Sequence, residues 1–249
     1  MKWELGDSND GWRQLRIEAP WEELADDYRD LLASYAQVKL PGFRPGKVPR
    51  AVLEQRFGRE IFDALGRRGA ERLGRQALRE AEIEAAGALE ISEIACIKEE
   101  PLRCTGRFIP FPAFALPDYR ALAVPKHAEA PLDELSRLLL ESTPFAVPAP
   151  LVRSELAVEG SDDEPGSAAW QAAEERVRLL LILKRIARSE GIEVDERDIE
   201  QRIAAKAREF ETTPAQLKAE LEQGGGYLRL RDLLLAESTL EYLLGRITY

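Results

Sequence analysis

The chain has 249 residues, 45% of them hydrophobic, which is enough for one large domain or for two ordinary domains with separate cores. Its 35 basic and 45 acidic side chains give a formal net charge of −10, which argues against general nucleic-acid binding. Basic residues are concentrated between Lys39 and Arg79, where 11 of them stand against four acidic residues. We therefore expect a protein that contacts an anion with this one region.

Composition also limits location and cofactors. No apolar segment follows Lys2 and no apolar run is long enough to span a membrane, so we expect neither a secretory signal nor a membrane contact, and we predict a cytoplasmic protein. Cys96 and Cys104 are expected to be reduced core residues. With His127 as the single histidine, a structural zinc site has too few ligands, and we predict no metal and no other cofactor.

Two strands and a helix are predicted first in chain order. Residues 3–5 and 12–17 are strand-like and flank a turn at 6–11 that is dense in Gly, Asp, Asn and Ser. After Pro20, apolar residues recur every three or four positions as far as Val38, which predicts one amphipathic helix. That helix leads into the stretch VKLPGFRPGKVP, residues 38–49.

Residues 38–49 indicate a stiff, exposed loop. Pro41, Pro45 and Pro49 recur at every fourth position, and Gly42 and Gly46 permit backbone turns that a side chain would disfavour. Such a loop has few conformations to lose when it binds a partner.

The tip of this loop carries one aromatic and two basic residues, Phe43, Arg44 and Lys47. This trio suits RNA phosphate or an acidic pocket of a protein, because Arg forms forked hydrogen bonds, Lys attracts anions and Phe stacks or fills a hollow. A Pro/Gly-rich turn with two cations is, by itself, more often a solvated connector.

The longer context resembles a known family. The run Gly42-Phe43-Arg44-x-Gly46-Lys47-x-Pro49, followed by Val52, Gln55, Arg56, Phe57 and Gly58, resembles the signature of trigger factor, the bacterial ribosome-associated chaperone. The resemblance implies that the loop docks beside the exit of the nascent-chain tunnel, where it touches ribosomal RNA and a ribosomal protein. By position, the docking residues would be Gly42, Phe43, Arg44, Gly46 and Lys47.

Beyond the loop we expect a short helix up to Gly58 and a longer helix over 59–81. Four arginines form a stripe on the longer helix, at positions Arg68, Arg72, Arg75 and Arg79. The stripe is either a further ribosomal RNA contact or a solvated face of the helix. A charged stripe on a helix is more often a solvated face. Three glycines imply either a kink or a close-packed neighbour, namely Gly66, Gly69 and Gly74.

Residues 89–98 and 102–109 predict a second hairpin, which would form a small antiparallel sheet with the first. The predicted fold class is α+β, with this sheet packed on helices in an N-terminal domain over 1–117. A linker over 118–131 and an all-α domain over 132–249 follow. The family normally carries an FK506-binding-type prolyl isomerase domain. In this chain residues 132–147 leave room for one helix only. We therefore predict that the protein is not an enzyme, although members of the family can carry the name of a prolyl isomerase.

The remaining chain is predicted to be helical over 148–159, 168–190, 195–211, from Pro214 onward, and over 227–247. This part resembles the helical arms and body of the same family. Candidate contacts to unfolded clients are apolar residues with few core partners: Leu151, Val152, Leu156, Val158 and Trp170.

The leading hypothesis is a chaperone that is docked on the ribosome and shields apolar segments of unfolded nascent polypeptides, with a possible homodimer when it is off the ribosome. The alternative is a ribosome-binding factor or assembly subunit whose helices hold a fixed protein partner. An exposed apolar groove would favour the chaperone, and a flat self-complementary apolar face would favour the subunit.

Overall fold

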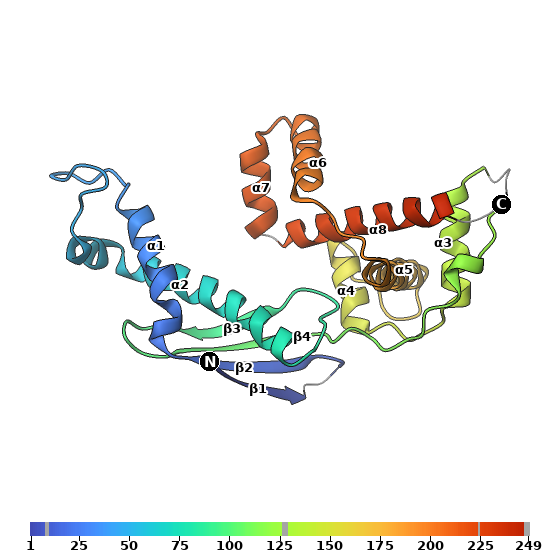
Figure 1. Ribbon diagram of the computed structural model, residues 1–249, viewed down its shortest axis with the longest axis horizontal. Coiled ribbons are helices and arrows are strands. Elements are labelled where there is room, and N and C mark those ends of the chain that lie inside the picture. Colours follow the sequence, from blue (N-terminus) through green and yellow to red (C-terminus); the bar gives the residue numbers. More distant parts are fainter. Residues whose placement is uncertain (8–9, 126–128, 224, 247–249) are drawn as a thin grey trace. The chain divides into compact units, whose positions relative to one another are not determined.

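The computed structural model describes residues 1–7, 10–125, 129–223 and 225–246. The chain divides into two compact units, Met1–Phe111 (unit 1) and Pro112–Tyr249 (unit 2) (Figure 1). The division falls before residue 117, where the first domain was predicted to end. His127 of the predicted linker lies outside the described residues.

Unit 1 is a four-stranded antiparallel sheet with helices on one face (Figure 1). In chain order its elements are β1 (Lys2–Asp7), β2 (Arg13–Ala19), the 3-10 helix η1 (Trp21–Leu24), α1 (Ala25–Tyr35), α2 (Arg50–Glu80), β3 (Glu90–Ala95) and β4 (Leu102–Phe108). The strand order is β1-β2-β4-β3, so the two hairpins join through β2 and β4, where Ile17 lies opposite Cys104. Both predicted hairpins and the predicted α+β class are confirmed.

The helical segment after Pro20 differs from the single helix that was predicted. Pro20 is the N-cap of η1 rather than a first helical residue, and α1 ends at Tyr35 rather than Val38. The end is a tightened turn, because the Val38 N–H donates to the carbonyl of Tyr35, three residues back, instead of continuing the α-helical pattern. The predicted break near Gly58 appears as a kink in α2 at Phe57, whose φ is −124° and ψ is 15°.

The core of unit 1 lies between α2 and the sheet. Its fully or nearly fully buried members alternate along β2 and β4 and recur on one side of α2; they include Leu15, Ile17, Leu102, Phe108, Ile61, Leu65 and Leu73. The helix lies close to its neighbours because glycine faces them: a Cβ on Gly69 would lie 2.5 Å from Leu24, and one on Gly74 would lie 2.3 Å from Leu89. The glycines of α2 therefore reflect close packing.

Unit 2 is helical. It contains a short 3-10 helix, η2 (Tyr119–Ala121), and six α-helices: α3 (Pro131–Ser142), α4 (Ala149–Val158), α5 (Ala168–Glu190), α6 (Glu196–Glu209), α7 (Pro214–Gln223) and α8 (Gly226–Arg246). The local signals behave as expected, since the Asp195 carboxylate caps α6 by accepting from the Arg197 N–H at 3.0 Å. Gly191 ends α5 with a left-handed φ of +68°.

Three apolar clusters can be distinguished among the described residues of unit 2. The first joins α3 to the C-terminal halves of α5 and α8 through Leu135, Leu139, Ile182, Ile186 and Leu243. The second lies between α4 and the start of α5, and the third lies between α6, α7 and the start of α8. Figure 1 shows α6 and α7 standing side by side on the N-terminal part of α8. Unit 2 thus consists of a body and two helical arms.

The predicted linker over 118–131 is, in its described part, packed onto the body. Tyr119 and Val124 are buried in the first core of unit 2. Glu190 at the end of α5 accepts hydrogen bonds from the Tyr119 hydroxyl at 2.7 Å, the Tyr242 hydroxyl at 2.6 Å and the Arg120 guanidinium at 2.6 Å. These three donors lower the pKa of the Glu190 carboxyl to about 2. The segment is held in place by burial and charge, which its Pro/Ala-rich composition did not indicate.

Candidate functional site

The loop between α1 and α2 begins with a tight turn at Leu40. The Phe43 N–H donates to the Leu40 carbonyl at 3.1 Å, with Pro41 and Gly42 between them. Gly42 has a φ of +84°. Proline at the second position and a left-handed residue at the third are the signature of a type II turn, in which glycine is strongly preferred.

A second turn of the same kind follows directly. The Lys47 N–H donates to the Arg44 carbonyl at 3.0 Å, with Pro45 at the second position and Gly46, whose φ is +78°, at the third. The Gly46 N–H donates to the Ala36 carbonyl at the end of α1, at 2.7 Å. Two tandem turns, one of them bonded to a helix end, make the loop a preorganised structure.

An apolar base supports the loop. Leu40 and Val48, which flank the two turns, are buried against Leu53 of α2. The rings of Tyr35 and Phe57 pack beside them, with centroids 5.4 Å apart. The kink at Phe57 thus lies where the loop rests on α2, and the loop is anchored at both ends.

The loop presents the predicted residues to solvent. Phe43 remains 39% exposed although it is aromatic, and Arg44 and Lys47 are exposed. Within the described part of the chain, neither cation has an ion pair within 4.0 Å. Figure 1 shows the loop projecting from the end of the α1–α2 pair. The structure therefore brings Phe43, Arg44 and Lys47 together on turns that Gly42 and Gly46 shape.

A charged cluster behind the loop was not anticipated from the sequence. Glu54, one turn into α2, accepts a hydrogen bond from the Tyr28 hydroxyl of α1, one from Arg50 at 2.6 Å and one from Lys98 at 2.8 Å. These donors, of which Lys98 has the largest effect, lower the pKa of the Glu54 carboxyl to about 2. The pKa of Tyr28 is raised to about 12, chiefly by burial and next by its hydrogen bond to Glu54. The i,i+4 spacing of Arg50 and Glu54 is a visible signal, but Tyr28 and Lys98 are distant in sequence.

The candidate client residues have three different environments. Val152, Leu156 and Trp170 are buried together and form the core of the α4–α5 arm, which leaves their side chains no free surface. Leu151 is half-buried, and Val158 is 61% exposed at the end of α4. Val152, Leu156 and Trp170 are buried because the two helices of the hairpin pack their apolar faces on each other. These three residues therefore have core partners, contrary to the expectation.

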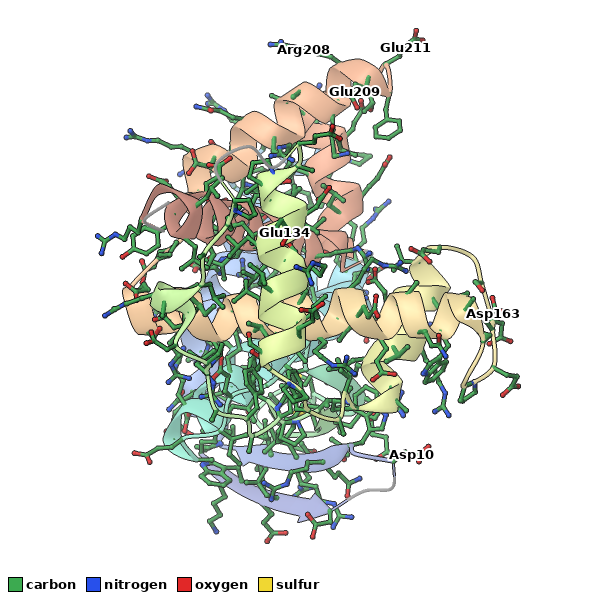
Figure 2. The ribbon with its side chains drawn as sticks, turned by 90° about the vertical axis from the view of Figure 1, so that its right-hand side faces the viewer. Asp10, Glu134, Asp163, Arg208, Glu209 and Glu211 are labelled. Atoms are coloured by element: carbon green, nitrogen blue, oxygen red, sulfur yellow. The ribbon has the colours of Figure 1, made fainter. Side chains whose placement is uncertain are left out.

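The α6–α7 arm carries an exposed aromatic residue, Phe210, in line with the apolar periodicity of Ile199 and Ile203. Ile199 and Ile203 are buried, but Phe210 is 66% exposed. The reason is its position at the C-cap of α6, one residue beyond the last helical turn. Figure 2 shows its neighbours Arg208, Glu209 and Glu211 projecting from the tip of this arm.

Two further properties bear on the kinds of site the chain offers. Among the described residues, no group of three or more His, Cys, Asp or Glu side chains could hold a metal ion. Across the described ranges, helices long and apolar enough to cross a membrane were not found.

Comparison with known proteins identifies the family. Residues 1–136 match the family model described as bacterial trigger factor protein, and residues 152–245 match the model for the trigger factor C-terminus. The trigger factor of Mycobacterium leprae is 38% identical over 113 residues, which cover 45% of this chain and 24% of the relative. That of Mycobacterium ulcerans is 35% identical over 131 residues, 52% of this chain and 27% of the relative.

The chain thus aligns with about a quarter of the length of these curated relatives. A solved structure described as "Promiscuous Substrate Recognition in Folding and Assembly Activities of the Trigger Factor Chaperone" aligns with 98% of this chain and 99% of that chain, at 12% identity and a TM-score of 0.48. A TM-score below 0.5 is too low to carry an argument. The family models, however, match more than half of the sequence between them, and the chain belongs to the bacterial trigger factor family.

Proposed function

We propose that this protein is a ribosome-associated chaperone that docks near the nascent-chain tunnel exit through the loop tip of Phe43, Arg44 and Lys47. The observation that carries the proposal is the pair of tandem type II turns that hold these three side chains at an exposed tip. The trigger factor signature on the same residues supports it.

The physical argument is one of preorganisation. A flexible loop loses about 1–2 kcal/mol of backbone entropy per ordered residue when it binds. Here the fixed φ of Pro41 and Pro45, the two turn hydrogen bonds and the bond from Gly46 to Ala36 have already imposed that order. The guanidinium and ammonium groups then attract phosphate or carboxylate, and the exposed ring of Phe43 adds apolar contact.

We further propose that unit 2 supplies the surface that shields nascent chains. Its exposed large apolar side chains are dispersed over several helices: Leu132, Val158, Phe210, Leu228 and Leu233. Weak contacts of about 25 cal/mol per Å² at such points favour reversible capture of unfolded segments. Of the predicted client residues, Val158 and Leu151 remain candidates for direct contact, while Val152, Leu156 and Trp170 maintain the arm that presents them.

The proposal includes no prolyl isomerase activity, a cytoplasmic location and a possible homodimer off the ribosome. The two family matches leave only residues 137–151 between them. We expect no acceleration of a proline-limited refolding reaction, and clear catalysis in that assay would overturn this part of the proposal.

The test of docking is co-sedimentation with bacterial ribosomes over a salt series. The variant replaces Phe43, Arg44 and Lys47 by Ala. The matched control replaces one exposed aromatic and two exposed cations at the C-terminal end of α6 by Ala: Phe210, Lys206 and Arg208. Ribosomes without nascent chains are used, because Phe210 belongs to the proposed client surface. We expect the parent and the control to bind with an affinity that falls as salt rises, and the loop variant to lose at least tenfold in affinity.

If the loop variant binds as well as the parent, the loop is not the anchor. If the parent itself fails to bind at low salt, the proposal of ribosome docking fails. The alternative, a subunit with a fixed protein partner, would then be favoured.

A further inference from the structure

Three arginines of α2 have no ionic partner in the described part of the chain. Arg68, Arg75 and Arg79 are exposed, and none of them has a carboxylate within 4.0 Å or a side-chain hydrogen bond. Arg72, the fourth member of the sequence pattern, differs because its Nε lies 3.2 Å from Asp27 and it donates to the Glu23 carbonyl at 2.6 Å. The structure thus assigns Arg72 to the packing of α1 on α2, whereas the other three arginines form no ion pair within 4.0 Å in the described part of the chain.

The helix fixes the backbone positions from which these three side chains project. Their spacing of seven and four residues places them on one side of the helix, at axial separations of roughly 10 and 6 Å. The opposite side of this part of α2 is buried, with Leu65 and Leu73 fully inaccessible in the core. The helix that carries the three arginines therefore cannot move without disrupting the core of unit 1, although the side chains themselves can change rotamer.

The surroundings of the three arginines favour a polyanion over a protein. None of the large exposed hydrophobic side chains of the described residues lies in the second part of α2, from Gly58 to Glu80. A protein partner would need an apolar centre for its interface. Glu71 is exposed on the same side of the helix and weakens the positive field, but it forms no ion pair with its arginine neighbours. Unpaired guanidinium groups without apolar surface suit phosphate, which accepts forked hydrogen bonds from arginine.

We propose that Arg68, Arg75 and Arg79, the α2 stripe, bind the phosphate backbone of an RNA helix as a second contact beside the loop tip. The assignment of that RNA to the ribosome rests on the proposed function. Two contacts on one rigid unit raise affinity by converting the second binding event into an intramolecular one, and they fix the orientation of unit 1 on its target.

The test measures binding to an RNA duplex of about 20 base pairs, by fluorescence anisotropy over a salt series, in the full chain. The stripe variant carries Arg68→Ala, Arg75→Ala and Arg79→Ala. Since each phosphate contact contributes roughly 0.7–0.9 to the slope of log affinity against log salt, we expect the variant to lower the slope by roughly two units and the affinity at least tenfold. The triple Arg→Lys variant should keep the slope, because it keeps the charge.

The control removes three exposed arginines of unit 2, Arg197, Arg208 and Arg231, which changes the net charge equally. Thermal unfolding of each variant, followed by circular dichroism, checks that unit 1 remains folded. If the stripe and control variants bind the duplex alike, the α2 stripe is only a solvated face.

Ribosome co-sedimentation of the same variants separates this inference from the proposed function. A stripe variant that weakens ribosome binding but not duplex binding would assign the stripe to an acidic protein and overturn the RNA contact. If the parent protein does not bind ribosomes but binds the duplex through the stripe, ribosome docking is overturned and the RNA contact is upheld.

Discussion

The two units differ in the way their cores are built. In unit 1 a single helix of 31 residues, α2, packs along one sheet, and one large core joins the strands to the helices, with the small apolar base of the loop beside it. In unit 2 the described apolar residues form smaller clusters, among them one in the body and one in each arm. The difference implies that unit 1 unfolds as a whole, whereas an arm of unit 2 can open while the body stays folded.

The units also differ in the use of their cations. Across unit 2, basic side chains tie helices together: Arg229 of α8 binds Glu155 of α4 at 2.8 Å, and Lys184 of α5 binds Asp232 of α8 at 3.0 Å. In the described part of unit 1 the cations of the loop tip and the α2 stripe form no ion pair within 4.0 Å. Paired charge fixes the positions of helices, and unpaired charge on a rigid support is available to a partner.

The largest effect should come from removing one buried leucine from each kind of core. We expect Leu65→Ala in unit 1 to cost about 3–4 kcal/mol and Leu156→Ala in the α4–α5 arm about 2–3 kcal/mol. Hydrogen exchange read by mass spectrometry should rise throughout unit 1 in the first variant. In the second it should rise only in α4 and the start of α5. Increased exchange across α6, α7 and α8 in the second variant would contradict the separation of the three cores.

A smaller effect tests the close packing of α2 on the sheet. A Cβ at Gly74 would lie 2.3 Å from Leu89, so Gly74→Ala must displace that side chain, at about 1–3 kcal/mol in urea unfolding. Gly58→Ala is the matched control, because nothing lies within 4 Å of its added Cβ. The control should be neutral or stabilise by up to about 1 kcal/mol. If Gly74→Ala is as neutral or stabilising as Gly58→Ala, helix propensity, and not packing, governs these glycines.

The smallest effect concerns the Glu54 cluster and pH. The pKa of Glu54 is lowered to about 2 in the folded protein from 4.5, so its stabilisation is complete above pH 4.5 and is lost as pH falls toward 2. The pKa of Tyr28 is raised to about 12 from 10.0, so its contribution is present below pH 10 and is lost as pH rises toward 12. Both dependences should diminish in Glu54→Gln, measured as unfolding free energy against pH.

Glu60→Gln, an exposed neighbour without an ion pair among the described residues, is the control for this measurement. A pH profile of Glu54→Gln that matches the parent at both ends would mean that the cluster does not stabilise unit 1.

Local features of this protein follow from the sequence alone. The tandem turns are specified by Pro41-Gly42 and Pro45-Gly46, because the fixed φ of proline and the freedom of glycine act within four residues. The cap at Asp195 and the stop at Gly191 are likewise decided by neighbouring backbone groups. Hairpins and helices were predicted for the same reason, with errors at their ends, as at Tyr35.

Only the tertiary structure decided which residues share an environment. Arg72 appears equivalent to Arg68 on a helical wheel, yet only Arg72 meets a carboxylate, from α1. Trp170 was expected to have few core partners and is buried, whereas Phe210 fits the apolar periodicity of α6 and is exposed. These outcomes depend on contacts between segments distant in the chain. Sequence periodicity determines which face of a helix is apolar, but the neighbour that covers that face is set by how the helices pack.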